Sequence, residues 1–467
     1  MDQQTLAERL AVLVKSYDVR GASPQELDTD VARAVGAAFA VETGAAADPA
    51  GGGGGAVVVG HDMRVTSPQI AEALAEGITS TGADVVSIGL ASTDMLYFAS
   101  GEWDLPGIMV TASHNPSGDN GLKLCRAGAR PIGRDTGLSA IADRAVAGVA
   151  PTGSAGAVTE RDALTAYAQR VTELVGVEQG GATRRRLKVV VDAANGMGGL
   201  IAPAVLARLD VEVHGLYLEL DGTFPNHPAN PLDPANLVDL QAAVREQGAD
   251  VGLAFDGDAD RCFVVDERGE LVSPSAVTAM IAARELRKHP GETVLHNVIT
   301  SRAVREVIVE SGGTPVRTPV GHSLIKAEMA RTGAVFGGEH SGHYYFRDFF
   351  LADSGMLAAL HVLAAMTASD DPLSEIVAEF ERYPSSGELN SRVADAAAVT
   401  ARVAAAYADQ EQDRLDGLTV TAADWWFNLR SSQTEPLLRL NVEADDEETM
   451  VSVRDAVLTL IHQEESP

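Results

Sequence analysis

Apolar and polar residues alternate along much of the chain in blocks that predict a strand, a helix and a second strand. Residues 56–59 (AVVV) form an apolar run typical of a buried strand, and residues 68–81 have the apolar spacing of a helix. Residues 84–88 (DVVSI) again predict a strand. These three segments together predict a β-α-β unit.

The same order of elements recurs twice further along the chain. The two copies comprise strand 187–191, a helix that ends near Arg208 and strand 211–213, and then strand 293–295, a helix from Ser301 to near Glu310 and strand 314–316. Three copies of one α/β module imply three similar domains, each with a mixed sheet between helices.

The pattern changes after a helical stretch at residues 354–366. Closely spaced apolar segments at 418–420, 425–429 and 437–442 predict strands, and residues 447–462 predict a helix. This arrangement predicts a smaller α+β domain, with residues 370–372 as the entry to the linker. The length of 467 residues suits four domains, which we expect at residues 1–155, 156–268, 269–372 and 373–467.

The composition is that of a folded enzyme, with 45% hydrophobic, 22% charged and 5% aromatic residues. No apolar run approaches the length of a membrane span, and the N-terminus lacks a basic segment followed by an apolar core. We therefore expect a cytoplasmic protein. The two cysteines, Cys125 and Cys262, are too few for a disulfide framework and lack the spacing of a structural zinc site.

A formal net charge of −30 excludes nucleic acids and anionic membranes as partners, because both require a basic surface. A phosphate ligand is repelled by the same charge, so a phosphate site needs local cations. Five cations lie within or beside motif-like segments of the chain and could supply this charge: Arg20, Lys123, Arg261, Lys326 and Arg430.

A serine follows one of the predicted strands. The apolar run at 105–110 (LPGIMV) leads into TASHNPSGDNG at 111–121, which places Ser113 on a loop at a strand end. Open α/β sheets bind ligands at such ends, so Ser113 is a candidate nucleophile. The alternative is an ordinary turn, since most of these residues favour turns. His114 does not indicate a hydrolase triad, because no G-x-S-x-G motif surrounds the serine.

Three carboxylates alternate after another predicted strand, in DGDADR at 256–261. A tight loop can direct Asp256, Asp258 and Asp260 at one hard cation. An EF-hand is excluded because Arg261 replaces the glycine which that loop requires and because the flanking segments resemble strands. Solvated acidic residues remain the alternative interpretation.

Two further polar motifs follow apolar strands. In GEHSGH at 338–343, glycines flank Glu339 and Ser341 and give short polar side chains the freedom to meet a polar ligand. In RSSQTEP at 430–436, Arg430, Ser432 and Thr434 combine a bidentate guanidinium with hydroxyls, which suits a phosphate. A Gly/Ser-rich turn and an exposed arginine are the alternatives.

In order and spacing, these four motifs resemble the α-D-phosphohexomutase family, of the bacterial phosphomannomutase/phosphoglucomutase type. The resemblance extends over the whole chain. It implies a four-domain, Mg²⁺-dependent enzyme that acts on a hexose phosphate, with phosphoserine 113 as phosphoryl carrier. It also implies hexose 1,6-bisphosphate as intermediate and activator. We expect a monomer or a dimer.

The resemblance also implies roles for individual residues. The metal ligands are the phosphorylated Ser113, Asp256, Asp258 and Asp260. The residues around the transferring group are Arg20, His114, Lys123 and Arg261. The residues that bind the sugar or its phosphate are Tyr17, Gly321, His322, Lys326, Glu339, Ser341 and His343. The non-transferring phosphate is assigned to Arg430, Ser432, Gln433 and Thr434.

One departure from the family pattern concerns sugar selectivity. Many relatives carry a lysine in the segment that reads NVIT at 297–300 here. The stretches at 338–343 and 386–391 nevertheless look more like phosphomannomutases, so we expect interconversion of mannose 6-phosphate and mannose 1-phosphate. Phosphoglucomutase or dual specificity stays open, and phosphoglucosamine mutase is a more distant alternative. A non-catalytic sugar-phosphate binding protein would not need Ser113 together with three carboxylates.

Overall fold

The computed structural model describes residues 2–47, 54–176, 186–431 and 437–463. The chain forms two compact units, each built from segments that are distant in the sequence. The first unit contains residues 1–272 and 341–376, and the second contains residues 273–340 and 377–467. Within the described parts of the chain, no helix combines the length and the apolarity needed to span a bilayer.

The first sheet of the first unit is mixed and has the strand order β1-β5-β4-β2-β3-β7, with β6 paired to β5. Its strands are β1 (Val19–Ala22), β2 (Ala56–His61), β3 (Asp84–Leu90), β4 (Gly107–Val110), β5 (Asp119–Arg126), β6 (Arg130–Pro131) and β7 (Val158–Glu160). The helices are α1 (Gln3–Leu13), α2 (Thr29–Glu42), α3 (Ser67–Ser80), α4 (Thr93–Trp103) and α5 (Leu138–Ala147). Strands β2 and β4 are parallel, so the loops that follow them leave the same edge of the sheet.

The second sheet of the first unit is also mixed, in the order β12-β11-β10-β8-β9. Its strands are β8 (Leu187–Asp192), β9 (Val211–Leu216), β10 (Val251–Phe255), β11 (Cys262–Asp266) and β12 (Leu271–Val272). The helices around it are α6 (Leu164–Val175), α7 (Gly198–Leu206), α8 (Val238–Gln247) and α12 (Gly355–Thr367). Strand β10 pairs with β11 as an antiparallel hairpin, and the turn of this hairpin carries the aspartate motif. The later segment of this unit adds the antiparallel pair β16 (Tyr344–Phe346) and β17 (Ala352–Asp353).

The second unit begins with three parallel strands in the order β14-β13-β15. These are β13 (Thr293–Asn297), β14 (Thr314–Thr318) and β15 (Phe336–Gly338), with helices α9 (Pro274–Lys288), α10 (Arg302–Glu310) and α11 (His322–Thr332). The side chains of Ser273 and Ser301 cap α9 and α10 at their first turns. The register pairs His296 with Gly338, so the segments after β13 and β15 leave the sheet together.

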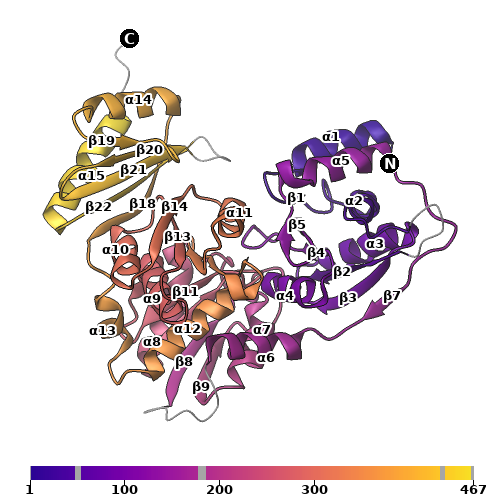
Figure 1. Ribbon diagram of the computed structural model, residues 1–467, viewed down its shortest axis with the longest axis horizontal. Helices are drawn as coiled ribbons and strands as arrows, with labels where there is room; N and C mark the ends of the chain where they lie inside the picture. Colours follow the sequence, from indigo (N-terminus) through magenta and orange to yellow (C-terminus); the bar gives the residue numbers. More distant parts are fainter. Residues whose placement is uncertain (1, 48–53, 177–185, 432–436, 464–467) are drawn as a thin grey trace. The chain divides into compact units, whose positions relative to one another are not determined.

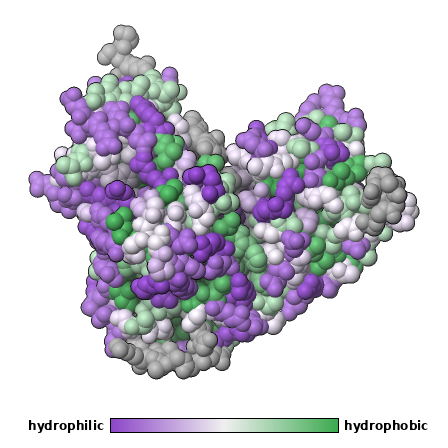
Figure 2. Space-filling view, viewed as in Figure 1, coloured by the Kyte–Doolittle hydropathy of each residue, from purple (hydrophilic) through white to green (hydrophobic). Residues whose placement is uncertain are grey.

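The C-terminal part of the second unit is an antiparallel sheet in the order β18-β22-β21-β20-β19. Its elements are β18 (Ser385–Arg392), α14 (Ala396–Ala406), β19 (Glu411–Asp413), β20 (Leu418–Thr421), β21 (Trp425–Ser431), β22 (Leu437–Ala444) and α15 (Glu447–His462), and α13 (Leu373–Ala378) precedes them. Figure 1 shows α14 and α15 on one face of this sheet, where Val403, Phe427 and Val457 belong to a shared core. Polar residues cover much of the visible face in Figure 2, in keeping with the acidic composition.

The predicted fold class is confirmed, with three α/β domains that have mixed sheets and a smaller C-terminal domain with an antiparallel sheet. The predicted helix 447–462 coincides with α15, and the predicted helix 354–366 is α12 to within a residue. One difference affects the candidate site. Strand β21 continues through Arg430 to Ser431 because it pairs with β22 there, so Arg430 lies on a strand and not in the loop that we expected.

Candidate active site

Ser113 lies buried in the segment that joins β4 to β5. Its φ of +50° is rare for a residue other than glycine, so surrounding contacts must hold this backbone conformation. The Ser113 N–H donates to the Thr111 hydroxyl at 2.9 Å, and the Ser113 hydroxyl donates to Asp256 Oδ2 at 2.7 Å. The predicted nucleophile therefore faces the predicted metal loop.

The turn between β10 and β11 brings three buried carboxylates together. One oxygen each from Asp256, Asp258 and Asp260 lies within 4.8 Å of the others. A Cβ at Gly257 would stand 2.2 Å from the Ser113 carbonyl oxygen, so glycine allows the two loops their close approach. Such a cluster of carboxylate oxygens can hold a hard divalent cation.

Lys123 on β5 places its ammonium group among these carboxylates. Its Nζ lies 2.7 Å from Asp258 Oδ2 and 2.5 Å from Asp260 Oδ2. Burial alone would lower the pKa of Lys123, but the two carboxylates raise it well above its ordinary value. Burial would likewise raise the pKa of Asp260, whereas Lys123 holds it well below its usual range. Lys123 is therefore a fixed positive charge next to an ionised carboxylate.

A polar atom in this cluster is left for a further ligand. Asp258 Oδ1 is buried and accepts no hydrogen bond from the residues that the structure describes. The other oxygen of the same carboxylate already attracts the Lys123 ammonium. A buried, unpaired carboxylate oxygen is unfavourable, so the residues present fit a cation at this position.

Arg261 and His114 contact the serine hydroxyl and each other. Arg261 Nε is 3.1 Å from Asp256 Oδ2, and its Nη2 is 3.3 Å from the Ser113 hydroxyl. Burial and the guanidinium of Arg261 lower the pKa of His114 well below its ordinary value. The neutral ring can accept a hydrogen bond from Arg261 through Nδ1, which lies 3.2 Å from Ser113 Oγ.

Arg20 on β1 belongs to the same group of cations. It donates to Asn115 Oδ1 at 2.9 Å and forms an ion pair with Asp18. Burial would lower the pKa of Arg20, but Asp18, Tyr17 and Asp258 raise it. Strand β1 pairs with β5, which explains how residues near the N-terminus reach the serine loop.

Ser341 and His343 lie in the first unit, beside the aspartate loop. His343 Nε2 is 3.5 Å from Asp260 Oδ1, and its Nδ1 is 3.0 Å from the Ser341 hydroxyl. Burial would lower the pKa of His343, but Asp260 raises it. A Cβ at Gly342 would stand 2.5 Å from the Phe263 ring, so glycine is needed where this segment crosses β11.

We did not predict a role for Arg64 from the sequence, yet its buried guanidinium contacts the serine loop. It donates to the carbonyl oxygens of Ser113, Asn115, Pro116 and Asp119 at 2.7–3.0 Å. The signal available in the sequence was its place just beyond strand β2, the same kind of strand end that carries the other motifs.

Glu339 lies buried in the second unit, at the end of β15. Its Oε1 accepts hydrogen bonds from the backbone N–H of Gly321 at 3.1 Å and from Asn297 Nδ2 at 3.4 Å. A Cβ at Gly338 would stand 2.4 Å from the Thr278 hydroxyl, which explains the glycine before the glutamate. The parallel strands β13 and β15 thus bring three of the sequence motifs of this unit together.

The structure describes some of the other predicted substrate-binding residues of the second unit. Lys326 is buried on α11, and Arg430 Nη2 lies 2.8 Å from Glu388 Oε2. Glu388 Oε1 also pairs with Arg439 at 3.2 Å. The side chain of His322 and the residues Ser432, Gln433 and Thr434 fall outside the described parts of the chain.

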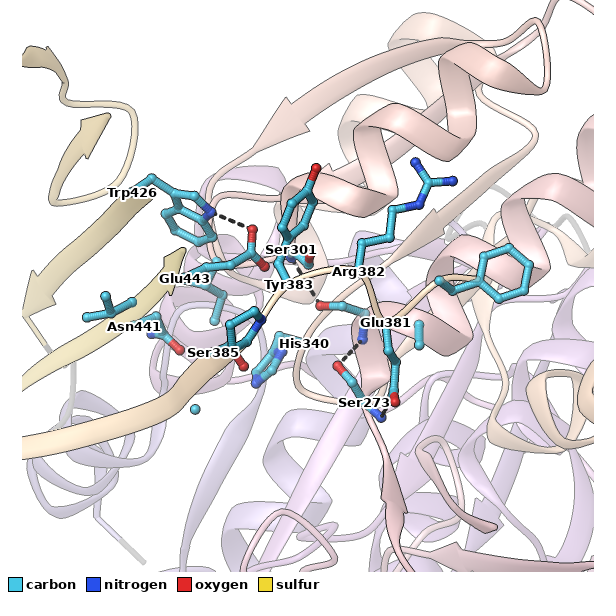
Figure 3. A pocket seen from close by; sticks show the side chains of 17 residues that line it. Ser273, Ser301, His340, Glu381, Arg382, Tyr383, Ser385, Trp426, Asn441 and Glu443 are labelled. Carbon is cyan, nitrogen blue, oxygen red and sulfur yellow. Dashed lines mark hydrogen bonds between the residues drawn. The ribbon is translucent and has the colours of Figure 1, made fainter. Parts of the chain in front are cut away.

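The second unit also contains a cavity of about 320 Å³ that the sequence did not predict. Figure 3 shows Trp426 and Glu443 on one side of it, joined by a hydrogen bond of 2.8 Å, with His340 and Ser273 opposite. The segment at 380–385 contributes Arg382 to the lining. Among the described residues that line the cavity, none is a predicted site residue.

Four family models match consecutive parts of this chain. They are described as phosphoglucomutase/phosphomannomutase domain I at residues 11–148, domain II at 165–269, domain III at 274–383 and the C-terminal domain at 388–460. The matches follow the order of the four motifs. Fold and site together thus define an enzyme with the phosphohexomutase architecture.

Individual relatives are similar over nearly the full length. A protein described as phosphohexose mutases from Xanthomonas campestris pv. campestris is 42% identical over 445 residues, which cover 94% of this chain and 96% of the relative. A phosphomannomutase from Salmonella typhimurium is 41% identical over 465 residues, with 96% and 98% covered. A crystal structure of a phosphoglucomutase/phosphomannomutase family protein from Burkholderia thailandensis matches with a TM-score of 0.85 and 32% identity, covering 99% of this chain and 98% of that one.

The chain belongs to the phosphoglucomutase/phosphomannomutase family. It is a phosphohexomutase-family enzyme of the isomerase class.

Proposed function

We propose that this enzyme is a Mg²⁺-dependent phosphomannomutase that interconverts mannose 6-phosphate and mannose 1-phosphate. The observation that carries the proposal is the Ser113 hydroxyl, 2.7 Å from Asp256 within a cluster of three carboxylates and three cationic side chains. A serine beside both cation ligands and fixed positive charges suits a residue that carries a phosphoryl group.

Asp256, Asp258 and Asp260 would hold the Mg²⁺, which supplies charge neutralisation at the phosphate on Ser113. The chain's own cations complete the neutralisation. Lys123 stays protonated because of its two carboxylate partners, so we assign it charge stabilisation at the transferring group. Arg261 lies close enough to donate to an oxygen on Ser113, and Arg20 is oriented by Asp18.

In the proposed reaction, phosphoserine 113 donates its phosphoryl group to the free hydroxyl of the sugar phosphate. The ester bond to Ser113 breaks as the new P–O bond to the sugar forms. The sugar hydroxyl loses a proton and the serine regains one, which gives a hexose 1,6-bisphosphate. After the bisphosphate reverses its orientation, its other phosphoryl group returns to Ser113. Positioning and charge neutralisation provide most of the rate enhancement.

We propose that Glu339 and Ser341 bind sugar hydroxyls and that His343, Lys326, His322, Gly321 and Tyr17 bind the sugar or its phosphate. Arg430 with Ser432, Gln433 and Thr434 would bind the non-transferring phosphate. Glu388 orients the Arg430 guanidinium through an ion pair, and the donors of Arg430 that do not face Glu388 would serve the phosphate.

A second candidate is a mutase that also accepts glucose phosphates. The Xanthomonas relatives are described as phosphohexose mutases and are 42% identical to this chain, against 41% for the Salmonella typhimurium phosphomannomutase. The segment at 297–300, which includes Ile299, lacks the lysine that many relatives carry there. This segment therefore does not discriminate between mannose and glucose phosphates as substrates.

A coupled assay with Mg²⁺ and hexose 1,6-bisphosphate tests the proposal. We expect kcat/KM to be highest for mannose 1-phosphate, lower for glucose 1-phosphate and lowest for glucosamine 1-phosphate. Equal use of the mannose and glucose substrates would replace the proposal by dual specificity. Peptide mapping after exposure to labelled substrate should place the label on Ser113, and label exchange that persists in Ser113→Ala would locate the carrier elsewhere.

A further inference from the structure

Arg64 is a buried cation among the described residues of the first unit, and neither the sequence motifs nor the proposed reaction gives it a role. It follows strand β2, and its side chain is 1% exposed. Nη1 donates to the carbonyl oxygens of Pro116 and Asp119 at 2.7 and 3.0 Å, and Nη2 donates to those of Ser113 and Asn115 at 2.8 and 2.7 Å. One guanidinium therefore binds four carbonyls of a seven-residue loop.

The remaining donor of this guanidinium faces a carboxylate. Arg64 Nε lies 3.3 Å from Asp62 Oδ2, which is fully buried. Asp62 Oδ1 accepts hydrogen bonds from the Arg64 backbone at 2.9 Å and from the Ser67 hydroxyl at 2.6 Å. Asp62 thus orients Arg64 at the edge of the sheet from which the serine loop also leaves.

The second α/β domain encloses Arg64 from the other side. The Phe224 ring centroid is 5.1 Å from Arg64 Cζ. A Cβ at Gly222 would stand 2.5 Å from Arg64 Cα. The arginine therefore has little room to move, and the loop that it binds is held by a rigid partner.

The contact with the Ser113 carbonyl connects Arg64 to the reacting atoms. That carbonyl oxygen also lies against Gly257 of the aspartate loop, where a Cβ would approach to 2.2 Å. Ser113 itself has a φ of +50°, a conformation that the surrounding contacts must maintain. By fixing this carbonyl, Arg64 determines where the Ser113 side chain points relative to Asp256.

We propose that Arg64 is a positioning residue for phosphoryl transfer, which keeps the loop at 113–119 in one conformation whether or not Ser113 carries a phosphate. The proposal rests on the function proposed above. The serine must accept and donate a phosphoryl group in alternate steps, and its oxygen must return to the same position each time. The four N–H groups on Nη1 and Nη2 of the guanidinium meet this requirement, whereas an ammonium has three donors and cannot satisfy four carbonyls.

The first test compares Arg64→Lys, which keeps the charge, with the wild-type enzyme. We expect kcat to fall about 100-fold or more, since small displacements of reacting groups have effects of this size. KM should stay within about threefold, because Arg64 does not belong to the proposed substrate ligands. Wild-type kcat in Arg64→Lys would overturn the inference.

Arg126→Lys is the matched control. Arg126 lies at the far end of β5 and also donates to backbone carbonyls, those of Glu42 and Thr136, both at 3.2 Å. We expect this variant to keep kcat and KM. A loss of kcat equal to that of Arg64→Lys would show a general cost of removing guanidinium contacts to backbone carbonyls and would overturn a specific role for Arg64.

Two further measurements keep the inference testable if Arg64→Lys does not fold. Asp62→Asn retains the guanidinium but weakens its orientation, and should lower kcat about tenfold at nearly constant KM; an unchanged kcat would count against the inference.

Hydrogen exchange reports on the loop without any catalysis. Amides at 113–120 should exchange at least tenfold faster in Asp62→Asn than in the wild type, and equal rates would overturn the inference. If the wild-type enzyme had no mutase activity but the loop amides still exchanged faster in Asp62→Asn, the proposed function would be refuted while the role of Arg64 in holding the loop would stand.

Discussion

Lys123 illustrates how single residues define this site. Its ammonium group touches two of the three carboxylates, and it is charged because they surround it. On a protein of net charge −30, cations that are buried against specific partners are the groups that can attract a phosphate. The same carboxylates that fix Lys123 are the ones proposed to hold the metal.

Asp258→Asn should therefore weaken metal binding more than sugar binding. The substitution removes one ionised ligand, and we expect the Mg²⁺ concentration for half-maximal activity to rise tenfold or more. Titration of activity with Mg²⁺ measures this, beginning from enzyme treated with EDTA. Glu246→Gln, at an exposed position on α8, is the control. An unchanged Mg²⁺ requirement in Asp258→Asn, or full activity in excess EDTA, would exclude the metal assignment.

Arg430→Ala should mainly raise KM, because this guanidinium is proposed to hold the phosphate that is not transferred. The loss of a charge-assisted contact made equally in ground and transition states predicts a KM about tenfold higher with a smaller change in kcat. Steady-state kinetics with mannose 1-phosphate measures both. Arg392→Ala, an exposed arginine at the end of β18, should leave KM unchanged. A normal KM in Arg430→Ala would contradict the assignment.

Motifs at strand ends are the feature from which the sequence predicts the candidate site, and the site roles stay predictions. Ser113 and Asp256 are 143 residues apart, yet each follows an apolar strand, and the structure brings their side chains into contact. Arg64 could not be predicted in the same way. Its hydrogen-bond partners are backbone carbonyls, which every residue type has. The sequence therefore cannot show which carbonyls the side chain contacts, because this depends on the fold.

At the scale of elements, buried strands were predictable and edge strands were not. Strand β2 contains the apolar run AVVV, and its central residues are buried. In contrast, β18 has the largely polar sequence SSGELNSR, and all three residues of β7 are exposed. These polar segments are strands because β22 and β3 pair with them. Such long-range pairing is absent from the local pattern of a sequence.

Asp94 links three helices of the first unit. Lying at the first turn of α4, it accepts hydrogen bonds from Ser92 at 2.5 Å, from Tyr167 on α6 at 2.6 Å and from Ser354 at the start of α12 at 2.6 Å. Burial, with a smaller contribution from Asp260, raises the pKa of Asp94 to about 7, although the three hydrogen bonds act to lower it. The packing of α4, α6 and α12 therefore favours a protonated carboxyl.

The free energy of unfolding should depend on pH through this group. Because the native pKa of Asp94 exceeds the unfolded value, its contribution is fully present below about pH 4 and is lost as the pH rises through about 7. Asp94→Asn cannot ionise. The substitution itself changes the free energy of unfolding by an amount that does not depend on pH. Between pH 5 and 8, the free energy of unfolding of Asp94→Asn minus that of the wild type should rise by on the order of 2–3 kcal/mol.

Denaturant unfolding at several pH values measures this difference. Glu102→Gln, an exposed position on the same helix, should give a curve parallel to that of the wild type. Parallel curves for Asp94→Asn and the wild type would show that Asp94 is already ionised in the native protein.

At the scale of the whole molecule, the compact units differ from the domains that we expected from the sequence. The predicted boundaries at 155/156, 268/269 and 372/373 stay predictions, and the family models match four consecutive segments. The chain nevertheless packs as two units, and each combines an early segment with a late one. Residues 341–376 return to the first unit and supply α12, which packs against α6 and β11.

This discontinuity has a consequence for the order in which the chain is synthesised and folds. When residue 272 leaves the ribosome, the first unit still lacks α12, the Ser354 hydroxyl that reaches Asp94, and His343 beside Asp260. About a hundred more residues must follow, which takes roughly 5–20 s at a synthesis rate of about 5–20 residues per second. During that interval the apolar surface of α6 and β11 that α12 covers in the native protein is exposed to solvent, and exposed apolar surface of this kind favours aggregation. Limited proteolysis of two truncated chains, one ending at residue 340 and one at residue 376, tests this. The protease should cleave within residues 1–272 of the shorter chain and leave the same region of the longer chain intact. Equal protection of the two chains would show that the first unit folds before its last helix arrives.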